Sequence, residues 1–90
     1  MMNSTEQALA ASIHEQPSVR NYSDPKVSSA DDGTVRVTVP FDPDSQMNRP
    51  VDVENLTAAM AGLGYVPASE VEVEDTFPFG ICVRGRFRRV

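Results

Sequence analysis

Two stretches in the last third of the chain alternate between charged and apolar residues. Residues 70–74 alternate glutamate with valine, and residues 81–88 alternate arginine with mostly apolar residues. A β-strand points successive side chains to opposite faces, so each stretch predicts a strand with one charged and one apolar face. The Pro-Phe-Gly run at residues 78–80 suits a three-residue hairpin loop. Together these features predict a C-terminal β-hairpin.

The length of that loop also predicts how the two strands pair. A loop of residues 78–80 places Phe77 opposite Ile81, and the charged residues then face one another at steps of two. Opposite charges across antiparallel strands contribute about 0.2–1 kcal/mol per pair, and they also select one register. On this prediction the hairpin neutralises most of its own arginine charge. The predicted pairs are Glu74 with Arg84, Glu72 with Arg86 and Glu70 with Arg88.

Earlier in the chain, weaker patterns predict a strand and a short helix. Valines alternate with polar residues over 34–39, which is typical of a strand with one buried face. Residues 26–29 suggest an additional edge strand. Residues 4–16 predict a short helix with Ser4 as its N-cap and a narrow apolar stripe.

Residues 53–63 predict the main helix. Their apolar positions recur at helical spacing, with Asp52 as the expected N-cap and Gly64 in the left-handed position after the last turn. Tyr65 is expected to fold back onto that turn.

The resulting order α-β-α-β-β predicts a small α+β domain. Two strands joined by a crossover helix are expected to run parallel. The C-terminal strand fits antiparallel between them, as in a split βαβ unit. We therefore expect a three-stranded antiparallel or mixed sheet with the main helix on one face. Residues 34–90 form this βαββ core, and residues 1–33 form a short helix and a polar loop whose order the sequence leaves open.

Charge is distributed unevenly along the 90 residues. The net charge is −5, all thirteen acidic residues precede Arg84, and four arginines lie within residues 84–89. An acidic body repels nucleic acid at long range and favours basic partners. A single cysteine excludes an intrachain disulfide, and no apolar run is long enough for a signal peptide or a membrane span. We therefore expect a cytoplasmic protein without membrane contact.

The acidic excess predicts a non-enzymatic protein-binding module, such as an inhibitor or adaptor. Its acidic surface would engage a basic protein, for example one that handles nucleic acid. Solubility is the plainer explanation for the same negative charge. The acids expected to contribute are Asp31, Asp32, Asp42, Asp44, Asp52 and Glu54.

A competing prediction assigns nucleic-acid binding to the arginine strand. Phe87 would be the aromatic residue available for base stacking, although its position in the alternation places it on the core face. Phe79, at the hairpin tip, is expected either to anchor a protein partner or to close the core. A homodimer through the sheet edge is a further kind of assembly that the pattern allows. The arginines of the competing prediction are Arg84, Arg86, Arg88 and Arg89.

The sequence gives little support to catalytic or metal sites. Asp42–Gln46 begins like a calcium-binding loop, but Met47 occupies the position where that loop requires glycine. One histidine and one cysteine are too few for a zinc site. Cys82 is expected to have a lowered pKa beside arginine, yet the only histidine, His14, lies on the N-terminal helix. We therefore expect no catalytic residues, no cofactor and no metal.

Overall fold

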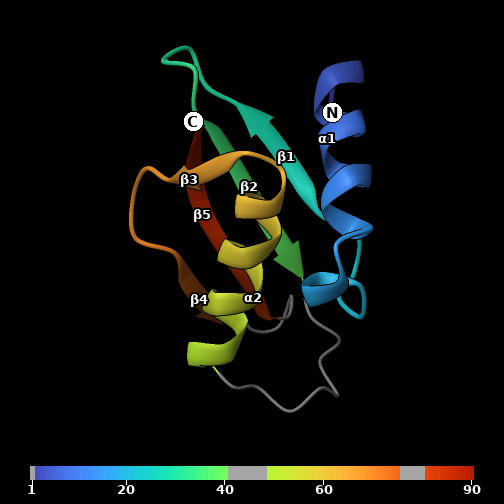
Figure 1. Ribbon diagram of the computed structural model, residues 1–90, viewed down its shortest axis with the longest axis vertical. Helices are drawn as coiled ribbons and strands as arrows, with labels where there is room; N and C mark the ends of the chain where they lie inside the picture. Colours follow the sequence, from blue (N-terminus) through green and yellow to red (C-terminus); the bar gives the residue numbers. More distant parts are fainter. Residues whose placement is uncertain (1, 41–48, 76–80) are drawn as a thin grey trace.

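A computed structural model describes residues 2–40, 49–75 and 81–90, and these form two layers (Figure 1). The strands of the described part make one antiparallel sheet in the order β1-β2-β5, and both β3 and β4 pair with the far side of β5. This confirms the predicted α+β class and the C-terminal hairpin. The elements are α1 (Ser4–His14), η1 (Pro17–Val19), β1 (Lys26–Ser29), β2 (Val35–Pro40), α2 (Arg49–Gly62), β3 (Tyr65–Pro67), β4 (Glu72–Asp75) and β5 (Ile81–Arg89).

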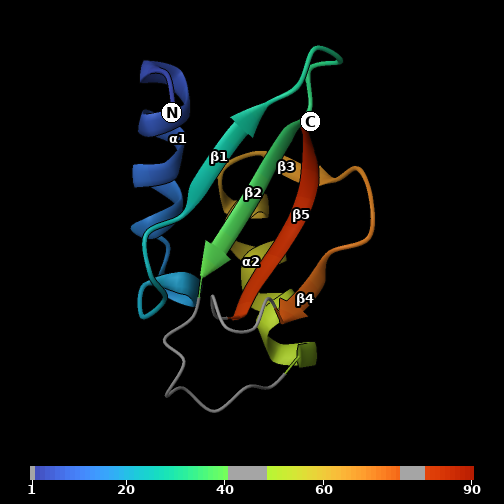
Figure 2. The ribbon, with the colours of Figure 1, turned by 180° about the vertical axis from the view of Figure 1, so that it is seen from behind.

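The arrangement of β2, α2 and β4 is the predicted split βαβ unit. Strand β5 is antiparallel to both β2 and β4, so those two strands run parallel to each other with β5 between them. Helix α2 covers one face of the sheet (Figure 1), and the described residues place no helix over the opposite face (Figure 2). Strand β1 is the edge strand suggested for residues 26–29, whereas β3 was not expected, so the sheet has more strands than the three of the predicted core. Tyr65 belongs to β3, where it pairs with Arg89, and its side chain packs against the core.

The core lies between the sheet and α2, and the N-terminal segment contributes to it. Ile13 of α1 and Val19 of η1 are fully buried, as are residues of β2, β5 and α2. The described residues on both sides of position 33 therefore share one core. Its members are Ala10, Ile13, Val19, Val27, Val37, Val39, Leu56, Ala59, Met60, Val83 and Phe87.

Both helices begin earlier than the sequence suggested. Asn3, not Ser4, caps α1: its Oδ1 accepts from the Glu6 backbone N–H, and the Glu6 carboxylate accepts from the Asn3 N–H, each at 2.8 Å. Helix α2 begins at Arg49, so Asp52 lies in the first turn and is not the N-cap. Gly64 has a φ of 88°, which is the left-handed conformation predicted for it.

Side chains of the N-terminal segment cover the outer edge of β1. The backbone N–H of Ser29 donates to the Glu6 carboxylate at 2.6 Å, and the N–H of Val27 lies 3.3 Å from the Met2 sulfur. Helix α1 runs beside β1 in both views (Figures 1 and 2). Glu6 therefore caps its own helix and also satisfies a backbone donor of the neighbouring strand.

This double role makes stability sensitive to acid. Hydrogen bonds from the backbone of Asn3, and then of Ser29, hold the pKa of Glu6 below its ordinary value of 4.5. The unfolded chain therefore takes up this proton at a higher pH than the folded protein does. The stabilisation is complete above about pH 4.5 and is lost as the pH falls through the folded pKa. Thermal unfolding of the wild type should show this loss below about pH 5, and Glu6→Gln should show a shallower one. An identical pH dependence in the two proteins would contradict the assignment.

The hairpin register differs from the prediction by two residues. Glu72 pairs with Arg84, and Glu74 pairs with Cys82. Asp75 pairs with Ile81, so the predicted pairing of Phe77 with Ile81 was wrong. The predicted loop Pro78-Phe79-Gly80 lies outside the described residues. A shift of two residues keeps every side chain on its predicted face, which is why the faces were correct although the partners were not.

Candidate functional site

The corrected register redistributes the charges on the open face of the sheet. Arg84 forms ion pairs with both neighbouring glutamates. Its Nη2 lies 3.2 Å from Glu72 Oε1, and its Nη1 lies 2.8 Å from Glu74 Oε2. Arg86 lies opposite Arg36 of β2. Arg88 lies opposite Val66 of β3. The predicted pairs of Arg86 and Arg88 with glutamate are therefore absent.

We expect Glu72 to couple energetically to Arg84 and not to Arg86. Glu72→Arg should destabilise the domain, and adding Arg84→Glu should restore about 0.5 kcal/mol, a small effect because both side chains are about half exposed. Urea unfolding of the four proteins in the double-mutant cycle gives the coupling energy. The matched cycle with Arg86→Glu should give no coupling; if it gave the larger value, the observed register would be wrong.

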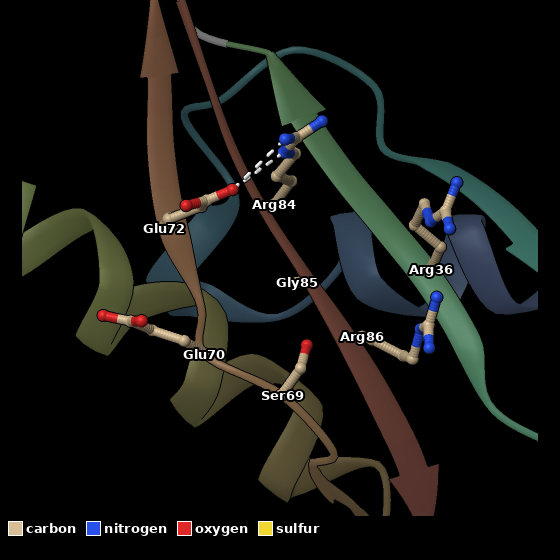
Figure 3. Close-up of a pocket in the computed structure, with 7 residues that line it drawn as sticks. All are labelled: Arg36, Ser69, Glu70, Glu72, Arg84, Gly85 and Arg86. Atoms are coloured by element: carbon tan, nitrogen blue, oxygen red, sulfur yellow. Dashed lines mark hydrogen bonds and ion pairs between the residues drawn. The ribbon is translucent and has the colours of Figure 1, made fainter.

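A shallow groove of about 450 Å³ lies on this open face (Figure 3). It forms where the sheet edge is interrupted between β3, which ends at Pro67, and β4, which begins at Glu72. One backbone hydrogen bond persists there, from the Ala68 N–H to the Arg86 carbonyl at 2.8 Å. The groove is lined by Arg36, Ser69, Glu70, Glu72, Arg84, Gly85 and Arg86.

Two arginines with like charge stand side by side in this groove. Arg36 and Arg86, hereafter the arginine pair, are direct cross-strand neighbours on β2 and β5. Like charges in this position destabilise a sheet. Figure 3 shows both side chains on the same side of the sheet, with Glu72 beside Arg84 and Glu70 pointing away. Within the described residues, no ion pair joins either member of the pair to a carboxylate.

The pKa of Asp32 is affected by one member of the arginine pair, Arg86. Its Oδ1 accepts two hydrogen bonds from Thr34, from the hydroxyl at 2.6 Å and from the backbone N–H at 3.0 Å. These bonds are the main reason that the pKa of Asp32 is lowered, and the charge of Arg86 adds to the effect. Asp32 and Arg86 form no ion pair in the described part of the chain, so Arg86 acts on Asp32 through its electrostatic field.

The predicted acidic surface is dispersed in the structure. Asp31 and Asp32 are exposed in the β1–β2 connection, and Glu54 is exposed on α2. The β1–β2 connection and the first turn of α2 lie at opposite ends of the molecule (Figures 1 and 2). Asp42 and Asp44 lie outside the described residues, as does Phe79. Those acids of the predicted surface that the structure describes do not gather on one face.

Asp52 was wrongly assigned to that surface. It is only 9% exposed and accepts a hydrogen bond from the Tyr22 hydroxyl at 2.6 Å. The same hydroxyl accepts a bond from Asn55 Nδ2 at 3.1 Å, and the Ser18 hydroxyl donates to the Asn55 carbonyl at 2.8 Å. Asp52 therefore helps to fasten the start of α2 to the segment after η1.

The residues considered for other chemistry are also placed. Burial raises the pKa of the Cys82 thiol, and Glu74 adds to this while Arg84 opposes it, so the predicted lowering was wrong. Phe87 is fully buried and unavailable for base stacking. His14 Nε2 lies 3.7 Å from Asp24 Oδ1 in a separate hollow that Cys82 does not line.

Two general features of the described residues complete this picture. They contain no group of three or more His, Cys, Asp or Glu side chains placed to hold a metal ion. Neither α1 nor α2 combines the length and the apolar character that a membrane-spanning helix requires.

Sequence reasoning missed Arg36 and Ser69 as members of this site. The alternation in β2 does place Arg36 on the polar face, but only the sheet order makes it a neighbour of Arg86. Ser69 lies in the irregular segment between β3 and β4, where no periodic pattern exists. No known protein family, curated protein or solved structure matches the chain, so the groove itself is the basis for assigning a function.

Proposed function

We propose that this protein is a non-enzymatic protein-binding module, an adaptor or inhibitor, and that it binds its partner at the groove. The carrying observation is the arginine pair, which has no carboxylate partner among the described residues and stands beside the acidic side of the same groove. Juxtaposed charges of both signs favour specific protein contacts, because a wrong partner meets like charge. An interaction surface built in this way explains a sheet face that carries an unfavourable charge pair.

This proposal moves the contact surface away from the acidic body. The described acids of the predicted surface lie on the β1–β2 connection and on α2, and Asp52 is buried, so these acids offer no common surface. The net charge of −5 still attracts a basic protein at long range. At contact, such a partner must present an anionic group to the arginine pair and cationic groups to the glutamates. A cytoplasmic location remains part of the proposal.

The corrected register gives nucleic-acid binding one specific point of support. Arg86 and Arg88 face no glutamate across the strand, and exposed Arg36 and Lys26 lie on the adjoining strands. Three features oppose it: the buried ring of Phe87, the overall negative charge and the glutamates that border the groove. A polyanion that followed the arginines would have to pass those glutamates. We therefore favour a protein partner.

Affinity capture followed by reconstitution tests the proposal. A captured protein, purified and mixed with this chain, should bind in the presence of nuclease and lose at least about tenfold in affinity with Arg36→Glu/Arg86→Glu. Arg89→Glu, on β5 but outside the groove, is the matched control and should bind like the wild type after allowance for its charge. Circular dichroism confirms that each variant is folded.

Three outcomes would contradict the proposal. Equal affinity of the groove variant and the wild type for the partner would show that the partner does not bind at the groove. Sensitivity to nuclease, together with affinity for short RNA or DNA, would assign the arginines to nucleic acid. Concentration-dependent self-association as the sole interaction would make the partner a second copy of this chain.

A further inference from the structure

We infer that the arginine pair recognises a dianionic phosphoryl group, carried by a phosphorylated serine or threonine side chain of the protein partner. This rests on the proposed function, because it specifies the anionic group that the partner brings to the groove. The site consists of Arg36 on β2, Arg86 on β5 and Ser69 in the segment between β3 and β4.

The charge of the arginine pair sets the charge of its ligand. The two residues are directly opposite across β2 and β5, where side-chain β-carbons are about 5 Å apart. A single carboxylate offsets one of the two positive charges, whereas a phosphoryl group near neutral pH carries close to two negative charges. Guanidinium groups also bind phosphoryl oxygens through paired N–H donors. A dianion therefore suits this position better than a carboxylate does.

The neighbouring acids do not occupy this role. Glu72 and Glu74 both contact Arg84, and Figure 3 shows Glu70 pointing away from the arginine pair. The Oδ1 of Asp32 is held by two donors of Thr34. The sheet therefore holds two adjacent cations that form no ion pair with a carboxylate among the described residues.

Ser69 supplies a neutral donor at the same place. Its side chain is exposed and lines the groove, and Figure 3 shows it between Glu70 and Arg86. Within the described residues its hydroxyl has no hydrogen-bond partner.

The shape of the groove indicates a group attached to a larger partner. Sites for free small molecules usually enclose most of the ligand surface. This groove is shallow and lies along the sheet, so a free phosphate ester would remain largely in water. A phosphorylated side chain gains the rest of its affinity from the surrounding protein contact.

A first test uses inorganic phosphate and O-phosphoserine as probes of the folded full chain. In ¹⁵N NMR titrations at constant ionic strength, both should shift the backbone amides of Arg36, Ser69 and Arg86 saturably, with a dissociation constant on the order of millimolar. Arg36→Gln and Arg86→Gln should each weaken binding at least about tenfold, and Arg89→Gln should not. Shifts that never saturate, or that appear equally with chloride, would overturn the phosphoryl site.

The unfolding temperatures of the same variants show whether the arginine pair serves recognition or stabilises the fold. If the arginine pair serves recognition, removing one charge relieves repulsion, so Arg36→Gln should unfold at the same temperature as the wild type or higher. Added phosphate should then raise the unfolding temperature of the wild type more than that of Arg36→Gln, which also reports the general stabilisation by this salt. A marked loss of stability in Arg36→Gln without phosphate would assign the pair to the fold instead.

The source of the phosphoryl group is tested with a short peptide containing one phosphoserine and with its unphosphorylated form. The phosphopeptide should bind more tightly than inorganic phosphate, and the unphosphorylated peptide should not bind. Equal affinity of phosphopeptide and free phosphate would overturn a protein source, and tighter binding of short RNA at the same salt would assign the site to nucleic acid. A flat phosphate titration with intact capture of a protein partner would reject this inference alone. Saturable phosphate binding without any captured partner would reject the proposed function instead.

Discussion

Replacing Phe87 with alanine should lower the free energy of unfolding by about 3–5 kcal/mol. Phe87 is fully buried, and it is the largest fully buried side chain among the described residues. It lies on β5, the strand that pairs with β2, β3 and β4. Its removal leaves a cavity between the sheet and α2, at the strand that joins both halves of the sheet. Domains of this size have total stabilities of about 5–15 kcal/mol, so the loss is a large fraction of the whole.

Urea unfolding followed by circular dichroism measures this effect. Phe87→Leu is the control, because it keeps most of the apolar volume and should cost about 1.5 kcal/mol or less. Equal losses in the two variants would show that the shape of the ring matters and the cavity does not. A loss below about 1 kcal/mol in Phe87→Ala would mean that the ring does not occupy the core as described.

Replacing Gly85 with alanine should destabilise the protein by about 1–3 kcal/mol. Alanine normally fits a strand at least as well as glycine does, because it loses less backbone entropy on folding. Here an added β-carbon would lie 2.9 Å from Cγ2 of Val71 and 3.1 Å from Cε2 of Phe87. Valine is stiff about its first side-chain torsion, and the Phe87 ring is held in the core. The steric cost therefore outweighs the entropic gain.

A decrease in unfolding temperature of roughly 5–20 °C is the corresponding observable for a chain of this length. Val71→Ala removes the closer of the two obstacles, so it should recover part of the loss when combined with Gly85→Ala. Additive effects of the two substitutions, or a Gly85→Ala protein as stable as the wild type, would contradict the close packing at this position.

The sequence predicted the faces of the sheet far better than the partners within it. The alternation of valine with arginine in β5 correctly placed Val83 and Phe87 in the core and Arg84 and Arg86 on the open face. A period-two pattern is unchanged by a shift of two residues, so it contains no information that distinguishes one such register from another. Only the turn could have done so, and the turn type was assumed.

The start of α2 shows a second limit. An aspartate before an apolar helical pattern usually indicates an N-cap, but Asp52 is instead used in a bond with Tyr22 that spans thirty residues of sequence. Such a tertiary contact leaves no local signal. Pro50 did carry one, because proline is favoured in the first turn of a helix, and it lies one residue after the observed start at Arg49.

The groove was beyond prediction for a related reason. It combines residues from β2, β5 and the irregular segment after β3, and their proximity depends on strand registers that were not predicted and on a segment without a periodic pattern. The sequence supplied the arginines but also suggested glutamate partners for them. In the observed register, Arg84 forms ion pairs with both nearby glutamates, and Arg86 lies opposite another arginine.

The contacts of Met2 and Glu6 with β1 have a consequence for how the protein behaves at high concentration. An exposed edge strand can pair with strands of other molecules and so begin aggregation. Here two backbone donors of that edge, at Val27 and Ser29, are already occupied by side chains of the same molecule. The start of α1 therefore hinders the addition of a strand from another molecule to this edge. Loss of these contacts would leave both donors free to pair with strands of other molecules.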